Sequence, residues 1–194
     1  FKSCGSLTSI NIPGSVTSIG NGAFAGCGKL TSIEIPSGVT NIGDITFQGC
    51  GSLTSINIPS NVASIGANAF FNCTGLKSIT IPKSVQSIGN NAFSGCTTLK
   101  EVLLEGGSTL TSENFGEVAN KVVTRWNEDN LTWTLTADGT MTISGSGAMK
   151  DYDIVDSPAT QKKDNVNKVV IENGITSIGA YAFYDCSSLT SIEI

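Results

Sequence analysis

The chain repeats one pattern every 23 residues, and this period constrains its fold more than any other feature. A cysteine marks the period, at Cys4, Cys27, Cys50, Cys73 and Cys96. Phenylalanine, leucine and isoleucine or valine recur at the same interval, beginning with Phe1, Leu7 and Ile10. A fixed period in this range is typical of a solenoid, in which each repeat is one coil stacked on its neighbours. We therefore predict a mostly β solenoid of 23-residue coils.

Each coil is predicted to contain two short strands and one helical turn. In "LTSINIP" the alternation points Ile10 and Ile12 inward and Asn11 outward, and the proline then ends the strand because it has no N–H for a ladder. "SVTSIG" indicates a second strand that ends at a glycine, which we expect at a bend with positive φ. "NGAFAG" is predicted to be a helical turn, closed by a left-handed glycine or asparagine. The bend glycines are Gly20, Gly43, Gly66 and Gly89, and the turn-closing residues are Gly26, Gly49, Asn72 and Gly95.

The repeated string Leu-x-x-Ile-x-Ile-Pro, Val-x-x-Ile-Gly and Ala-Phe-x-Gly-Cys resembles the BspA-type (Treponema-type) leucine-rich repeat. The match covers residues 1–104 closely and resumes at 169–194. The resemblance implies a leucine-rich repeat array that is secreted by, or displayed on, host-associated bacteria. It also implies attachment to host proteins, to other bacteria or to host cells.

The repeat weakens after Cys96, which predicts a change of organisation. Residues 105–126 are expected to form a degenerate capping coil, because Glu105 and Val118 replace the proline and the cysteine. "NEDN" at 127–130 is expected to be a polar linker. The alternating segment "LTWTLTADGTMTIS" predicts a β-hairpin with a type I′ turn at Asp138-Gly139.

Beyond the hairpin, Ser157-Pro158 indicates a short helix over "PATQKKD". The hairpin region resembles a small β module that accompanies such repeats in Gram-positive gut bacteria. The predicted domains are a leucine-rich repeat array with its capping coil at 1–126, a linker and small β-hairpin module at 127–168, and the start of a second array at 169–194.

Charge and composition exclude several classes of function. With 11 basic and 16 acidic residues, the net charge of −5 argues against nucleic acid and anionic membrane surfaces as partners. No apolar run approaches the about 20 residues that would span a bilayer. The absence of histidine removes histidine-based catalysis and the commonest metal ligand. Glu34, Asp44 and Glu101 occupy unrelated columns, which argues against a glycosidase pair. We therefore expect no enzyme activity, no cofactor and no membrane insertion of this segment.

The cysteines and one acidic loop allow two further kinds of chemical site. The cysteines could form disulfides or bind a metal, but stacked parallel side chains do not favour the near-perpendicular dihedral of a disulfide. We expect buried thiols that are weakly hydrogen-bonded to the backbone. "DYDIVD" places Asp151, Asp153 and Asp156 together, as a calcium loop does, but lacks the glycine and final glutamate of an EF-hand. An ordinary solvated loop is therefore expected there.

The candidate partner-binding residues point outward from the repeat or break it. On the outward row of the first strand they are Asn11, Glu34, Asn57 and Thr80. Four further candidates lie in the segment predicted to be a helical turn, at two positions of the repeat where stacking does not require an apolar side chain. We call them the turn-column residues: Ile45, Phe71, Tyr181 and Tyr184. Exposed aromatic ridges are typical of recognition surfaces. The alternative is that these side chains pack against the hairpin module or a cap.

These features favour an extracellular or cell-surface module for protein interaction and adhesion. Its expected partners are host or bacterial surface proteins, or glycans. The alternatives are a rigid spacer in a larger surface protein and a non-catalytic carbohydrate-binding part of a secreted enzyme. The chain begins within the pattern at Phe1 and stops at Ile194, one residue before the expected proline. We expect a window onto a longer protein, and end-to-end self-association through the unfinished ends is the alternative.

Overall fold

The computed structural model describes all 194 residues and is mostly β, with twelve strands and two 3-10 helices. The chain forms two compact units. Unit 1 comprises residues 1–104 and 108–122, and unit 2 comprises 105–107 and 123–194. No helix has the length and apolar character needed to cross a membrane.

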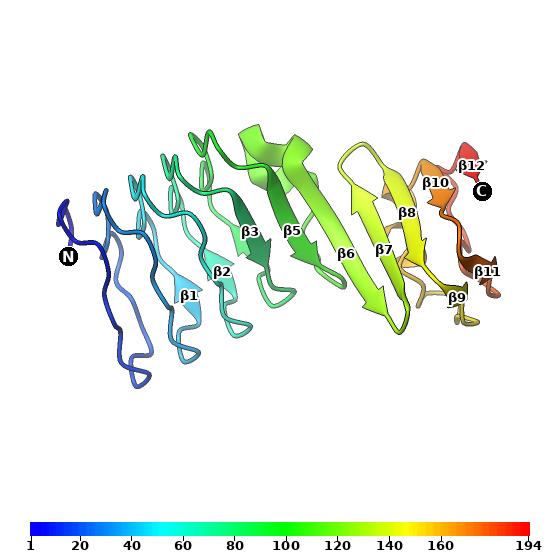
Figure 1. Cartoon of the computed structure of the whole chain (residues 1–194), viewed down its shortest axis with the longest axis horizontal. Helices are drawn as coiled ribbons and strands as arrows, with labels where there is room; N and C mark the ends of the chain where they lie inside the picture. The colour runs from blue at the N-terminus through cyan, green and yellow to red at the C-terminus, as the bar shows by residue number, and fades with distance from the viewer. The chain divides into compact units, whose positions relative to one another are not determined.

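Unit 1 is built from short parallel strands and turns that place successive repeats side by side (Figure 1). Strands β1, β2 and β4 pair residues that lie one repeat apart, so that Ile65 is paired with both Ile42 and Ile88. β3 and β5 pair in the same register. The elements are β1 (Asn41–Ile42), β2 (Ser64–Ile65), β3 (Ser78–Ile81), β4 (Ser87–Ile88), β5 (Glu101–Glu105) and the 3-10 helix η1 (Ser112–Lys121).

A stack of phenylalanine rings runs through the core of unit 1. The ring centroids of Phe24 and Phe47 are 5.6 Å apart, and those of Phe47 and Phe70 are 5.4 Å apart, with interplanar angles of 4° and 14°. Phe93 continues the stack to Phe115 of η1, at 5.9 Å. The period of the sequence therefore places each ring directly against the ring of the next repeat, and Phe115 joins the stack although the segment around it matches the pattern weakly.

The segment predicted as a helical turn is instead a series of β-turns. Ala25 donates its N–H to the carbonyl of Gly22, and Cys27 donates to that of Phe24. The third residue of each of the turns 20–23 and 24–27 has positive φ, 65° at Gly22 and 75° at Gly26, so the backbone leaves the helical region. The left-handed conformation expected at the four turn-closing residues is confirmed, with φ between 57° and 75° at Gly26, Gly49, Asn72 and Gly95.

The same turns also bond to the next repeat. Three alternate N–H groups of one turn donate to three alternate carbonyls of the turn that follows it, at 2.7 to 3.0 Å. In the second repeat the donors are Gly22, Phe24 and Gly26, and the acceptors are Asp44, Thr46 and Gln48. A helical turn would use these N–H groups within itself, so the inter-repeat ladder explains why the turns are not helical.

The bend glycines are required for a different reason from the one predicted. Gly43, Gly66 and Gly89 do not have positive φ. A Cβ at Gly89 would lie 2.3 Å from the backbone nitrogen of Ala67, and one at Gly66 would meet the preceding repeat at 2.5 to 2.7 Å. At Gly66 and Gly89 glycine is therefore needed because the backbone of the preceding repeat approaches too closely for any side chain. At Gly43 the close atom is instead the side-chain oxygen of Asn21, at 2.2 Å, and at Gly20 nothing lies within 4 Å.

Unit 2 contains a mixed sheet in the order β6-β7-β8-β10-β12. The first two pairs are antiparallel, and the pairs β8–β10 and β10–β12 are parallel. Its core surrounds Trp133, which is fully buried. The elements are β6 (Val122–Glu128), β7 (Leu131–Thr136), β8 (Thr140–Gly145), β9 (Gly147–Ala148), the 3-10 helix η2 (Thr160–Asn165), β10 (Lys168–Ile171), β11 (Ile175–Ser177) and β12 (Ser191–Glu193).

The predicted hairpin is confirmed as β7 and β8, but two details differ. Its loop is not a type I′ turn, because Gly139 has a positive φ of 84° and Asp138 does not. Asn127 and Glu128, which lie in the predicted linker, belong to β6 and pair with β7. Alternate residues of β6 are buried from Val122 onward, so this segment is a strand of the hairpin sheet.

Replacing Gly89 with alanine tests the close approach between repeats. We expect Gly89→Ala to lower the free energy of unfolding by about 1–3 kcal/mol, because the new methyl group overlaps backbone. Gly20→Ala is the matched control, since Gly20 occupies the same column and a Cβ on this residue would meet nothing within 4 Å. Denaturant unfolding followed by circular dichroism measures both, and equal destabilisation by the two variants would contradict this explanation.

Candidate functional site

The outward row of the predicted first strand is the candidate interaction surface, although the structure forms this strand only at Thr80, in β3, and leaves Asn11, Glu34 and Asn57 outside any strand. Asn11, Glu34, Asn57 and Thr80 occupy equivalent positions of four successive repeats, and all four are exposed. In β3 the residues alternate between exposed and buried, so the row faces away from the core as the alternation predicts. The role of this row in binding stays a prediction.

Three of these residues line one groove of about 540 Å³. Asn11, Glu34 and Asn57 come from three neighbouring repeats, and Pro36 and Pro59 also line the groove. Thr80 lies outside the groove. These three residues lie outside the strands of unit 1, and each occupies the same position of its repeat, so the groove presents one polar group from each of three successive repeats, two amides and one carboxylate. This arrangement provides both hydrogen-bond donors and acceptors along one line.

The groove side chains make no hydrogen bond or ion pair within the chain, and this separates them from other polar residues of the repeat. Asn21 Oδ1 accepts the N–H of Asp44 at 3.1 Å, and Asp44 Oδ1 accepts the N–H of Ala67 at 2.8 Å. Those two side chains therefore hold neighbouring repeats together. Asn11, Glu34 and Asn57 have no such task, which leaves their polar groups available to a partner.

The turn-column residues of unit 1 are half-buried rather than fully exposed. Ile45 has a φ of 51°, and its Cδ1 atom lies 3.3 Å from the place that a Cβ on Gly22 would occupy. Ile45 therefore covers the glycine of the preceding repeat, in keeping with the packing alternative. Phe71 is also half-buried, an intermediate exposure that favours neither binding nor packing by itself.

The turn-column residues of unit 2 are exposed. Tyr181 and Tyr184 are 52% and 45% exposed, and their ring centroids lie 5.7 Å apart in an edge-to-face arrangement. Lys163 pairs with Asp185 beside them. The four turn-column candidates thus belong to two different units, with one aromatic pair in unit 2.

All six cysteines are free thiols; Cys27, Cys50, Cys73 and Cys96 are buried and donate to the backbone as expected, whereas Cys4 is exposed and Cys186 is half-buried. Cys50 Sγ donates to the carbonyl of Phe24 at 3.2 Å, and Cys96 Sγ donates to that of Phe70 at 3.1 Å. Burial raises the pKa of Cys50 to about 12 and that of Cys96 to about 11. These thiols stay protonated, so they are poor nucleophiles and poor metal ligands. No group of three or more cysteine, aspartate or glutamate side chains is placed to hold a metal ion.

The acidic loop is attached to the turn of the last repeat. Asp151 Oδ1 accepts the N–H of Ala180 at 2.7 Å, and Tyr152 donates its N–H to the carbonyl of the same residue at 3.0 Å. Asp153 and Asp156 are exposed. Asp151 therefore serves to dock the loop, which is a structural role for the first residue of the "DYDIVD" stretch.

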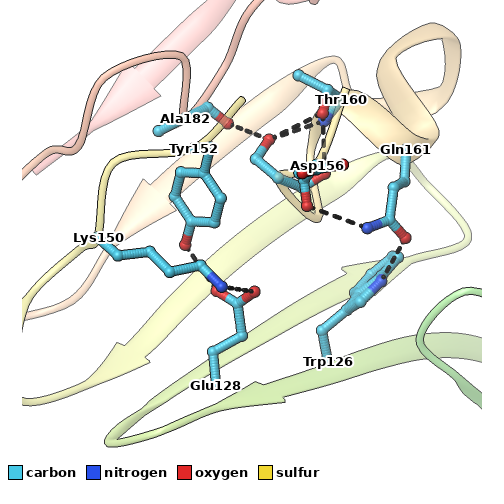
Figure 2. Close-up of polar contacts among 9 residues, drawn as sticks. Trp126, Glu128, Lys150, Tyr152, Asp156, Thr160, Gln161 and Ala182 are labelled. Atoms are coloured by element: carbon cyan, nitrogen blue, oxygen red, sulfur yellow. Dashed lines mark hydrogen bonds and ion pairs between the residues drawn. The ribbon is translucent and has the colours of Figure 1, made fainter. Parts of the chain in front are cut away.

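Figure 2 shows a network of polar side chains in unit 2 that the sequence did not indicate. The Tyr152 hydroxyl donates to Glu128 Oε2 at 2.6 Å, Lys150 Nζ pairs with Glu128 Oε1 at 3.1 Å, and Trp126 Nε1 donates to Gln161 Oε1 at 3.1 Å. Burial, and then the bond to Glu128, raises the pKa of Tyr152. The network joins β6 to η2 and to the acidic loop. Its partners lie 22 to 35 residues apart in the sequence with no shared motif, so no local signal could have found it.

Ser157 anchors the segment predicted to be a short helix. Its Oγ donates to the carbonyl of Ala182 at 2.6 Å and accepts the N–H of Thr160 at 3.0 Å. The helix itself is η2, which begins two residues later than the predicted stretch. Ser157 thus connects η2 to the last repeat within unit 2.

Comparison with known families and structures identifies what the chain resembles. The family model of the BspA type leucine-rich repeat region matches six copies, over residues 1–119 and 154–194. A leucine-rich repeat protein of T. pallidum is 26% identical over 98% of this chain, with a TM-score of 0.52. No curated protein sequence matches the chain significantly.

Two further solved structures are similar in sequence. A leucine-rich repeat protein from Bacteroides ovatus ATCC 8483 is 26% identical over 99% of this chain, with a TM-score of 0.48. A leucine-rich cell surface protein from Faecalibacterium prausnitzii A2-165 is 28% identical over the whole chain, with a TM-score of 0.45. The chain spans 56% of each of these two proteins and 68% of the T. pallidum protein.

Thiol labelling tests the packing of the cysteine column. In native buffer near neutral pH we expect a maleimide reagent to modify the exposed Cys4 rapidly, whereas Cys50, Cys73 and Cys96 resist modification because they are buried and protonated. In denaturant all six cysteines should react. Peptide mass spectrometry assigns each site, and rapid native labelling of Cys73 would contradict the structure.

The raised thiol pKa values also predict a pH dependence of stability. A thiol whose pKa is higher in the folded than in the unfolded chain stabilises the fold fully below the unfolded value, about 8.5, and loses this contribution as the pH rises through the folded value. We therefore expect the free energy of unfolding to fall between about pH 8.5 and the folded values of about 11 and 12 for Cys96 and Cys50. Cys50→Ala should show a shallower fall in the same denaturant titrations.

Proposed function

The chain belongs to the BspA-type leucine-rich repeat family, and from this premise we propose that it is a secreted or cell-surface interaction module. In this proposal the repeats form a solenoid of 23-residue coils, and its outward surface binds host or bacterial surface macromolecules. The module acts by adhesion and carries out no catalysis.

The observation that carries the proposal is the set of unengaged polar side chains in the groove. Asn11, Glu34 and Asn57 are exposed and have no partner within the chain, although neighbouring polar columns are used for stacking. Polar groups that neither support the fold nor face the core are available for recognition. Their repetition along the array suits a partner that is itself extended.

The groove favours a polypeptide over a glycan as its partner. Sugars are commonly held against the faces of aromatic rings, and no aromatic residue lines this groove. Amide and carboxylate groups that recur from one repeat to the next can bond to the donors and acceptors of an extended peptide backbone. Pro36 and Pro59 add rigid apolar surface at the groove wall.

A rigid spacer is the second candidate function, and one observation favours it. The phenylalanine stack continues through unit 1 as far as Phe115, and the turn ladder links each turn to the next from Gly22 to Ser94. Such continuity holds repeats in a fixed register whether or not anything binds. The interaction module and the spacer differ in whether the groove binds a partner, and mutation of the groove residues tests this difference.

A binding screen of the purified chain tests the proposal. The probes are immobilised extracellular-matrix proteins, bacterial surface proteins and a glycan panel, and we expect saturable binding to a protein. The triple variant Asn11→Ala, Glu34→Gln, Asn57→Ala should bind about tenfold more weakly or worse, since each lost hydrogen bond contributes about 0.5–1.5 kcal/mol. Gln86→Ala with Asn90→Ala is the matched control, because both residues are exposed polar side chains of unit 1 outside the groove.

The outcomes separate the alternatives. Equal loss of binding in the groove variant and the control would place the interaction elsewhere. Binding to glycans alone would favour a carbohydrate-binding module. No binding by a chain whose circular dichroism shows it to be folded would favour the spacer.

A further inference from the structure

The chain contains two Asn-Gly dipeptides, Asn21-Gly22 and Asn173-Gly174. Asparagine followed by glycine is the sequence in which the backbone nitrogen of the second residue most easily reaches the side-chain amide carbon of the first. Reaction requires both groups to be unrestrained, so the structural setting decides whether it happens. The two dipeptides occupy opposite settings.

Asn21-Gly22 is held on both sides by the next repeat. Asn21 Oδ1 accepts the N–H of Asp44 at 3.1 Å, which fixes the side-chain amide. Gly22 donates its own N–H to the carbonyl of Asp44 at 2.9 Å, as part of the turn ladder. Both the electrophilic carbon and the attacking nitrogen are therefore restrained by the same neighbouring residue.

Asn173-Gly174 lies in the exposed turn between β10 and β11. The Asn173 side chain is exposed and makes no hydrogen bond within the chain. The N–H of Gly174 donates no hydrogen bond either, although its carbonyl accepts the N–H of Gly147 at 2.9 Å. Neither reacting group is restrained by a hydrogen bond, in contrast to the first dipeptide.

We propose that Asn173 is a site of spontaneous deamidation and backbone isomerisation, and that the stacking of repeats protects Asn21 from the same reaction. The Gly174 nitrogen loses its proton to solvent base and forms a bond to Asn173 Cγ. The bond from Cγ to the side-chain nitrogen breaks, and ammonia leaves with a proton from solvent. The product is a cyclic imide that joins residues 173 and 174.

Water then opens the imide in one of two directions. Cleavage of the bond between the nitrogen and Cγ leaves an aspartate in a normal backbone. Cleavage of the bond between the nitrogen and the backbone carbonyl carbon leaves an isoaspartyl linkage, in which the chain runs through Cγ. The net reaction consumes one water, releases one ammonia and adds one negative charge, with no oxidation or reduction.

The isoaspartyl product would change the structure locally. It adds one carbon to the backbone directly before Gly174, whose carbonyl accepts the N–H of Gly147 and where an added Cβ would lie 2.6 Å from the carbonyl oxygen of Gly145. Pairing between β9 and β11 begins at Gly147 and Ile175, so it would lose its register first. The modification therefore loosens one edge of unit 2.

Timed incubation of the intact chain in mildly alkaline buffer at body temperature tests the proposal. Peptide mass spectrometry with electron-transfer fragmentation follows the mass gain at both asparagines and distinguishes aspartate from isoaspartate. In the folded chain we expect Asn173 to react at least roughly thirtyfold faster than Asn21, the factor expected from opening two hydrogen bonds. In denaturant the two rates should converge, since both are Asn-Gly.

Variants and outcomes complete the test. Asn173→Gln should abolish the reaction at 173 and leave the rate at Asn21 unchanged. Similar native rates at the two sites would overturn the role of the inter-repeat bonds. Failure of Asn173 to react in the folded chain, with both sites reacting in denaturant, would overturn the proposed site.

Discussion

Each repeat depends on hydrogen bonds between its backbone and the backbone of the next repeat. The turn of one repeat points alternate N–H groups at the carbonyls of the following turn, as Phe24 does with Thr46 and Phe47 does with Ala69. These bonds set the distance between repeats, and that distance places the phenylalanine rings within 5.3 to 5.6 Å of one another in the regular repeats. It also leaves no room for a side chain at Gly66 and Gly89. Core packing and glycine requirement are thus consequences of one ladder.

This dependence divides the polar residues into two groups that look alike in the sequence. Asn11 and Asn21 are both asparagines of the same 23-residue repeat. Asn21 caps a backbone N–H of the next repeat, whereas Asn11 bonds to nothing within the chain. Periodicity marks the column that each residue occupies but does not tell which columns the ladder uses. Alternation of apolar and polar residues was therefore enough to assign the candidate residues to the outward row. Only the three-dimensional structure distinguished them from polar residues such as Asn21 that bond to the next repeat.

The sequence allowed the apolar columns, the thiol bonds to the backbone and the β7–β8 hairpin to be predicted, because each follows from a strict repeat or a strict alternation. The prediction was wrong where backbone N–H groups bond to a residue of another repeat. The turn "NGAFAG" has the length of a helical turn, but its N–H groups bond to the next repeat. The strand β6 was missed for another reason, since its partner β7 is adjacent in the sequence: Glu128 pairs with Leu131 across Asp129-Asn130, a turn that lies in the segment predicted to be a linker. The Glu128–Tyr152 bond joins residues 24 apart with no motif between them.

The turn column that contains Gly22 and Ile45 shows how function can be sought in such an array. The backbone there is left-handed in every repeat, and Gly22, Asn68 and Asn91 accept this conformation at little cost. Ile45 and Tyr181 do not, since a side chain with a bulky or branched Cβ in this region costs about 1–2 kcal/mol. Ile45 recovers part of that cost by covering Gly22 of the preceding repeat. Tyr181 is 52% exposed and packs against Tyr184, so less of that cost is recovered by burial, and an uncompensated backbone strain of this kind is where a functional role is to be sought first.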